Sequence, residues 1–110
     1  GEDDVILLGD LNADEYHLGA LGDLPGIFCA ISGVPTNTRG TRTYDNIVFD
    51  RRATVEYTGR SGVLDLRREY GLTLEQALEI SDHLPVWAVF RTHEGARGPL
   101  ASESRQTGMR

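Results

Sequence analysis

The chain contains a single cysteine, Cys29, among its 110 residues. One thiol cannot form a disulfide within the chain or supply the thiolate set of a zinc site, so disulfide scaffolds and cysteine-based zinc sites are excluded. No apolar run approaches the roughly 20 residues that a membrane-spanning helix needs. No basic-then-apolar leader is present either, so we expect no secretory signal within these residues. These absences leave the cellular location of the protein open.

Lysine is absent: all 11 basic residues are arginine, against 17 acidic residues, and the net charge is −6. Residues 1–35 hold seven acids and no arginine, whereas residues 36–70 hold seven arginines and five acids. Guanidinium groups match the geometry of phosphate oxygens, so an acidic segment beside an arginine-rich one fits a metal site next to a phosphate-binding loop. A solvated surface of mixed charge explains the same pattern.

Short apolar and β-branched runs predict most of the secondary structure to be strand. The runs at 5–8 and 85–91 are apolar on both faces, which predicts strands that are buried on both sides. A third strand is expected at 27–31. Residues 43–49 and 53–57 are rich in β-forming residues and are separated by three turn residues, so they predict a hairpin, and a further strand is expected at 62–66.

Two helices are predicted, over residues 14–24 and from Thr73 to about residue 80. The second begins with a capping box at Thr73, in which the threonine hydroxyl and the Gln76 side chain bind backbone donors of the first turn. Residues 32–42 have the composition of a loop. Residues 92–110 are polar with almost no apolar content, and we expect a disordered tail.

Three polar clusters lie at the ends of predicted strands, where α/β folds gather reactive groups. Taken alone, the first is more typical of an ordinary turn, and the second, at residues 44–46, of a surface acid at a strand end. The cluster at residues 81–86 is equally typical of a helix exit. The clusters are Gly9-Asp10-Leu11-Asn12-Ala13-Asp14, Tyr44-Asp45-Asn46, and Ser81-Asp82-His83-Leu84-Pro85-Val86.

The residue types in these clusters suit phosphate chemistry. Asp10 and Asn12 are two positions apart and would hold a water and a phosphate oxygen in fixed geometry. Asp82 offers a hard oxygen ligand of the kind that Mg²⁺ favours. His83 is a candidate general acid or base, and Asp45 is a candidate partner that fixes one nitrogen of its ring.

In order and spacing, the three clusters resemble the C-terminal half of the endonuclease/exonuclease/phosphatase superfamily, and look closest to bacterial members similar to deoxyribonuclease I. The resemblance covers about residues 4–91. It implies an α/β (α+β) fold that is part of a four-layer β-sandwich flanked by helices, with the N-terminal half of the domain absent. Residues 1–91 are then expected to be the C-terminal half of such a domain and residues 92–110 a tail.

The resemblance also implies a role for each matching residue. Asp10, Asn12, Asp45 and His83 match the catalytic residues: Asp10 orients the attacking water, Asn12 and His83 bind the phosphate, and Asp45 pairs with His83. Asp82 and Asp10 match metal ligands. The ion expected is Mg²⁺ or Mn²⁺, and similar members also use threonines and acids near residues 36–42 to hold a structural Ca²⁺.

The loop at 32–42 is a candidate phosphate-binding segment because its hydroxyl and guanidinium groups are suited to contact backbone phosphates. The polar residues suited to such contacts are Thr36, Asn37, Thr38, Arg39, Thr41 and Arg42. Of these, Thr38, Arg39 and Thr41 are the ones that we assign to phosphate binding. An ordinary polar connection explains the composition equally well.

The leading functional hypothesis is metal-dependent phosphodiester hydrolysis with DNA as substrate and partner. One alternative keeps the fold and changes the substrate to a small phosphate ester, an inositol phosphate or a phospholipid headgroup. Another is a catalytically incomplete chain, because the family's metal-binding glutamate lies in the N-terminal half that would have to join this one. The oligomeric state is left open.

Overall fold

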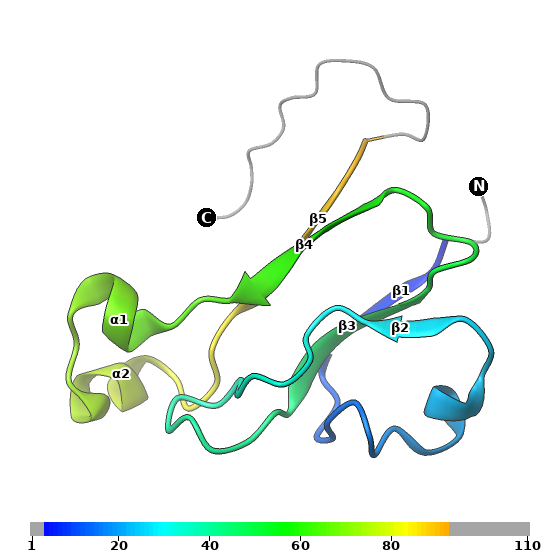
Figure 1. Ribbon diagram of the computed structural model, residues 1–110. Coiled ribbons are helices and arrows are strands. Elements are labelled where there is room, and N and C mark those ends of the chain that lie inside the picture. The colour runs from blue at the N-terminus through cyan, green and yellow to red at the C-terminus, as the bar shows by residue number, and fades with distance from the viewer. Residues whose placement is uncertain (1–3, 93–110) are drawn as a thin grey trace.

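Five strands, two short α-helices and one 3-10 helix make up residues 4–92 of the computed structural model, the part of the chain that the structure describes. The strands form two separate antiparallel sheets, one in the order β1-β3-β2 and one of β4 and β5. Residues 93–110 of the expected tail lie outside the described residues. The elements in chain order are β1 (Ile6–Asp10), η1 (Gly19–Asp23), β2 (Ile27–Cys29), β3 (Asp45–Asp50), β4 (Tyr57–Val63), α1 (Leu66–Tyr70), α2 (Leu74–Ile80) and β5 (Val86–Phe90) (Figure 1).

Strand β3 is the centre of the first sheet. It pairs with β1 along one edge and with β2 along the other, and its first five residues, 45–49, are all buried. The register places Asp10 at the end of β1 opposite Asp45 at the start of β3. The first two polar clusters are therefore adjacent because of strand pairing.

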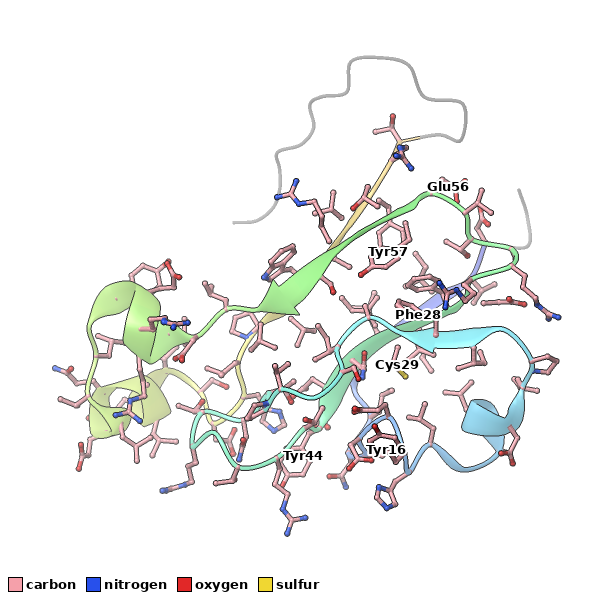
Figure 2. The ribbon with its side chains drawn as sticks, in the orientation of Figure 1. Tyr16, Phe28, Cys29, Tyr44, Glu56 and Tyr57 are labelled. Atoms are coloured by element: carbon pink, nitrogen blue, oxygen red, sulfur yellow. The ribbon has the colours of Figure 1, made fainter. Side chains whose placement is uncertain are left out.

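Aromatic rings join the two sheets. Phe49 of β3 lies 5.4 Å from Phe28 of β2, 5.1 Å from Tyr57 of β4 and 5.4 Å from Phe90 of β5, measured between ring centroids. Tilted and edge-on arrangements at these distances are favourable for aromatic pairs. Figure 2 shows Phe28 and Tyr57 between the two layers. This packing of one antiparallel sheet on another confirms the expected mixed α+β class and fits part of a β-sandwich.

The hairpin expected across residues 50–52 is wrong. The chain does turn there, with Ala53 and Thr54 donating backbone hydrogen bonds to the Asp50 carbonyl. Both edges of β3 are already paired, so the next strand joins the second sheet and pairs with β5 instead. That strand, β4, continues to Val63 and includes the start of the segment expected as a separate strand at 62–66.

The burial expected for the first strand on both faces is also wrong. Val5 is 69% exposed and Leu8 65% exposed, although the run forms a strand as predicted. The physical reason is position: β1 is an edge strand, and no other element within residues 4–92 covers its two faces. An apolar run reports the tendency to be buried, whereas burial itself depends on what packs against the strand.

The helix expected over residues 14–24 is reduced to a 3-10 helix at Gly19–Asp23, with turns before it. Two glycines within that segment disfavour a longer helix. The second predicted helix is confirmed as α2, and its capping box at Thr73 and Gln76 is complete. Figure 1 shows α1 and α2 beyond one end of β4 and β5 rather than over a sheet face. No helix in the described part of the chain is long and apolar enough to cross a membrane.

Candidate active site

The third polar cluster lies across the loop that precedes β3. Two backbone hydrogen bonds fasten it there: the Leu84 N–H donates to the Thr36 carbonyl at 2.7 Å, and the Thr38 N–H donates to the Asp82 carbonyl at 2.9 Å. They flank an isolated antiparallel bridge that His83 forms with the loop. These contacts place His83, which is 38 residues after Asp45 in the sequence, beside the start of β3.

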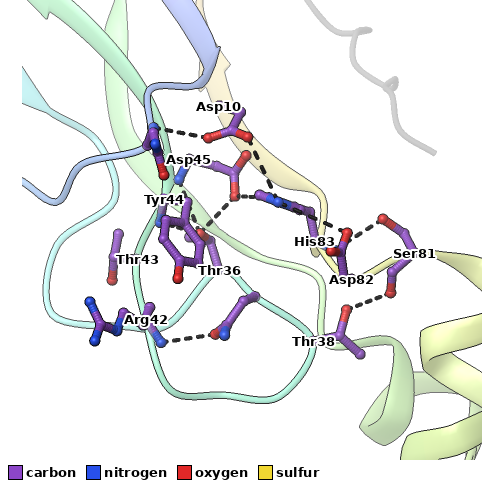
Figure 3. A network of polar contacts seen from close by, with 12 residues as sticks. Asp10, Thr36, Thr38, Arg42, Thr43, Tyr44, Asp45, Ser81, Asp82 and His83 are labelled. Carbon is purple, nitrogen blue, oxygen red and sulfur yellow. Dashed lines mark hydrogen bonds and ion pairs between the residues drawn. The ribbon is translucent and has the colours of Figure 1, made fainter.

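His83 is held by the carboxylate of Asp45. The Nδ1 atom of the ring lies 2.8 Å from Asp45 Oδ2, and the Thr36 hydroxyl donates to the same oxygen at 2.8 Å (Figure 3). The Thr36 oxygen in turn accepts hydrogen bonds from the backbone N–H groups of Tyr44 and Asp45. Thr36 is fully buried and Asp45 is 8% exposed. The carboxylate is therefore fixed from several sides, and it fixes the ring.

The other nitrogen of the His83 ring faces two more carboxylates. Its Nε2 atom is 3.7 Å from Asp10 Oδ2 and 4.0 Å from Asp82 Oδ1. The side chains of Asp10 and Asp82 are 53% and 82% exposed, so both are open to solvent. The pKa of His83 is raised above its usual value of 6.5, chiefly by the hydrogen bond to Asp45. The negative charges of Asp45, Asp10 and Asp82 add to this rise, and partial burial opposes it.

A tight turn after β1 holds Asp10 and Asn12. The backbone N–H of Asn12 donates to Asp10 Oδ1 at 2.9 Å, and it also shares the Tyr44 carbonyl with the N–H of Leu11. Asn12 has a φ of 56°, a left-handed conformation that asparagine tolerates better than most residues. The first cluster therefore forms a turn, and this turn holds the Asp10 carboxylate beside the His83 ring. We call Asp10, Asp45, Asp82 and His83 the His83 site.

Oxygen and nitrogen atoms of Asp10, Asp45 and His83 lie within 4.8 Å of one another, a spacing that would hold a metal ion. Asp45 and the Nδ1 atom of His83 already bind each other, whereas the Asp10 carboxylate is exposed and its hydrogen bond from the Asn12 N–H is made through Oδ1. Asp82 is outside the group but borders the same ring nitrogen. Mg²⁺ binds through one or two carboxylates and keeps several waters, so these residues fit such an ion.

The three loop residues expected to bind phosphate lie in different settings. The Thr38 hydroxyl donates to the Ser81 carbonyl at 2.7 Å, and the Thr41 hydroxyl accepts from Asn37 Nδ2 at 2.8 Å. Both hydroxyls thus take part in shaping the loop and joining it to the third cluster. Arg39 is exposed near the tip of the loop.

Residues outside the three clusters also build the site, and the sequence did not indicate their structural roles. Thr36 and Asn37 were expected as candidate phosphate contacts of the loop. In the structure Thr36 instead binds Asp45, and Asn37 Oδ1 accepts from the N–H groups of Thr41 and Arg42. Within the third cluster, the Ser81 hydroxyl accepts from the His83 N–H. Asparagine in a short polar loop is a local signal for such a turn. No local signal connects Thr36 to a carboxylate nine residues away.

No family model matches the chain. Curated relatives do match it. Deoxyribonuclease-1-like 1 of Sus scrofa is 39% identical over 94 residues, 76% of this chain and 30% of that protein. Deoxyribonuclease-1-like 1 of Bos taurus is 40% identical over 103 residues, 78% of this chain and 33% of that protein. Deoxyribonuclease-1-like 2 of Mus musculus is 34% identical over 105 residues, 83% of this chain and 37% of that protein.

The chain therefore spans about a third of the length of the curated relatives that it matches. These relatives are mammalian, so they give no support to the expected closeness to bacterial members. The similarity covers most of the chain. It agrees with the two antiparallel sheets and with the polar clusters that lie together at the end of β1 and the start of β3. The chain belongs to the deoxyribonuclease I-like branch of the endonuclease/exonuclease/phosphatase superfamily.

Proposed function

We propose that the full-length protein carrying these residues is a metal-dependent nuclease that hydrolyses phosphodiester bonds in DNA. One observation carries the proposal: a histidine held by a buried carboxylate at 2.8 Å turns its other ring nitrogen toward exposed carboxylates. The deoxyribonuclease names of the relatives support nucleic acid as the substrate.

His83 is suited to contact the phosphate. Asp45 takes Nδ1, which leaves Nε2 to donate a proton to a phosphate oxygen or to the leaving group. The raised pKa of His83 favours the protonated ring, which is the form that stabilises the charge developing on phosphate oxygens. Asp45 would act as the positioning residue of this pair.

Asp10 is suited to orient the attacking water. Its Oδ1 is bound to the Asn12 N–H, which leaves Oδ2 directed toward the His83 ring and open to solvent. A carboxylate in this position would accept a proton from water as it attacks the phosphorus in line with the leaving oxygen. Asn12, on the exposed side of the same turn, would donate an amide hydrogen bond to the phosphate.

Asp10 and Asp82 would hold Mg²⁺ or Mn²⁺. When bound, such an ion offsets the negative charge of the phosphate and of the developing transition state. A structural Ca²⁺ near residues 36–42 has less support, because the hydroxyls of Thr36, Thr38 and Thr41 already bind protein groups.

Nicking of supercoiled plasmid by the full-length protein tests the proposal. We expect nicking with Mg²⁺, none with EDTA, and at least about a 100-fold loss of rate in Asp10→Asn and in His83→Gln, because each removes a proton-transfer group. Asp23→Asn is the matched control: Asp23 is an exposed acid in η1, away from the His83 site.

Full activity in Asp10→Asn or His83→Gln would overturn these assignments. A folded wild-type protein that fails to nick DNA but releases phosphate from a small ester would favour the alternative substrate class. Activity toward neither substrate would favour a catalytically incomplete protein.

A further inference from the structure

A cavity of about 600 Å³ opens beside the His83 site. Two of its lining residues, Asn12 and Tyr44, also belong to the surroundings of that site. The backbone of Asn12 binds the Asp10 carboxylate, and the Tyr44 ring lies 5.7 Å from the His83 ring between centroids. The cavity therefore borders the His83 site at the Asn12 turn and the Tyr44 ring.

The cationic residue in this lining is Arg42. Its backbone is fixed, because its N–H donates to Asn37 Oδ1 at 2.9 Å and its carbonyl accepts from the Thr36 N–H at 2.9 Å. Within residues 4–92 no carboxylate forms an ion pair with the Arg42 guanidinium, and the side chain is exposed. Figure 3 shows Arg42 and His83 on opposite sides of the Tyr44 ring. The Arg42 backbone is thus held by hydrogen bonds, while its guanidinium group is exposed to solvent.

Asp14 is the acid in the same lining, and its charge is partly engaged. Its Oδ1 atom accepts from the Tyr16 N–H and is bound to Nδ1 of His17, and the hydrogen bond to His17 lowers the pKa of Asp14. The carboxylate is therefore directed to its own turn. Arg42 remains the charged group of the lining that has no partner among the described residues.

We infer that this cavity binds the phosphate group next to the scissile one on the substrate strand, and that Arg42 is the residue that contacts it. The inference rests on the proposed function and adds a second phosphate contact, which a polynucleotide can make and a small phosphate ester cannot. A volume of about 600 Å³ is in the range of sites that hold a nucleotide-sized group. The guanidinium fork matches phosphate oxygens in pairs.

The cavity lining distinguishes between the two arginines of the loop. Both arginines of the loop are candidates from the sequence, and Arg39 was the one assigned to phosphate; the cavity lining includes Arg42 and not Arg39. Between the two arginines the chain turns: the Gly40 N–H donates to the Asn37 carbonyl and the Thr41 N–H donates to Asn37 Oδ1.

The test compares two substrates in the full-length protein with Mg²⁺: a DNA duplex and the small diester bis(p-nitrophenyl) phosphate. We expect Arg42→Gln to lower kcat/KM for DNA by about 10-fold, the loss typical of one charge-assisted hydrogen bond, and to leave the small diester unchanged. Arg60→Gln removes the same charge from an exposed position on β4 and serves as the control. Arg39→Gln is tested beside it as the competing assignment.

DNA binding in EDTA provides a second measurement that does not depend on turnover. Loss of one phosphate contact reduces the slope of log K against log salt by about 0.9, and we expect this change in Arg42→Gln alone. Equal losses on both substrates, an unchanged salt slope, or the expected losses in Arg39→Gln instead of Arg42→Gln would overturn the inference. A wild-type protein that cleaves neither substrate would overturn the proposed function, and the salt slope would still decide the role of Arg42.

Discussion

At the scale of single residues, the chain from Thr36 through Asp45 to His83 explains how a surface histidine acquires a fixed orientation. A buried carboxylate needs hydrogen-bond donors, and Asp45 obtains them from the Thr36 hydroxyl and the His83 ring. His83 is only partly buried, so its alignment comes from this carboxylate and from its backbone bridge to the loop. Asp45 therefore both binds the loop through Thr36 and orients the His83 ring and raises its pKa.

Substitution of Asp45 should change the titration of His83. We expect Asp45→Asn to lower the His83 pKa, because the hydrogen bond to Asp45 is the main cause of its rise. A raised folded-state pKa stabilises the protein fully below the unfolded value of 6.5, and this contribution is lost as the pH rises through the folded value. The destabilisation caused by Asp45→Asn should thus be larger at pH 5.5 than at pH 8.5.

NMR titration of the His83 ring protons in EDTA measures the pKa, and urea unfolding at the two pH values measures the stability. His17→Gln provides the control spectrum that assigns the resonances. An unchanged His83 pKa in Asp45→Asn would show that the Asp45 hydrogen bond does not set it.

At the scale of elements, β3 and the loop before it determine where the chemistry lies. β3 brings Asp45 opposite Asp10 through its pairing with β1, and the loop brings His83 to the same place through hydrogen bonds at Thr36 and Thr38. The loop is irregular but tightly bound, since Thr36, Asn37 and Thr38 are all buried. Fixing an irregular loop in this way is a common means of placing reactive groups on a rigid sheet.

Removal of the Thr36 hydroxyl should loosen the loop from β3. Thr36→Val keeps the shape of the side chain but leaves the Tyr44 and Asp45 N–H groups and the Asp45 carboxylate short of a partner. We expect a loss of about 1–3 kcal/mol in the free energy of unfolding. Urea unfolding of the full-length protein measures it, with Thr36→Ser, which retains the hydroxyl, as the control. A Thr36→Val variant as stable as Thr36→Ser would contradict this account.

At the scale of the whole molecule, the two sheets meet over a small core. The buried apolar side chains of the described region are Ile31, Ile47, Val48, Phe49, Leu66, Ala77 and Leu84. Large apolar side chains on β1 and Trp87 on β5 are substantially exposed. Exposed apolar surface of this kind marks a place where further protein packs or where molecules associate.

The 110-residue chain in isolation should therefore unfold with little cooperativity. Its small core gives little free energy to offset the loss of conformational entropy on folding. We expect a broad thermal transition by circular dichroism and binding of a hydrophobic dye before heating. A steep transition without dye binding would show that these residues form a stable unit by themselves, and the enzymatic tests would then apply to the chain alone.

Local patterns were sufficient for several elements. The capping box at Thr73 and the runs that form β1, β2 and β5 depend on near neighbours in the chain, and each is present in the structure. The three polar clusters were recognisable for the same reason, since each is a short segment with its own turn chemistry. The predicted hairpin pairing between β3 and the strand that follows it is wrong, because the choice of sheet depends on which strand edges are already occupied.

The family and the residue types available for phosphate chemistry could be recognised without the structure, because both are recorded in short contiguous segments. Which of these groups lie together is seen only in the folded chain: Thr36 binds Asp45, His83 faces Asp10 and Asp82, and Arg42 lines the adjoining cavity. These contacts join segments that are distant along the chain. Their geometry comes from strand register and loop closure, which depend on the packing of the whole and not on any local pattern.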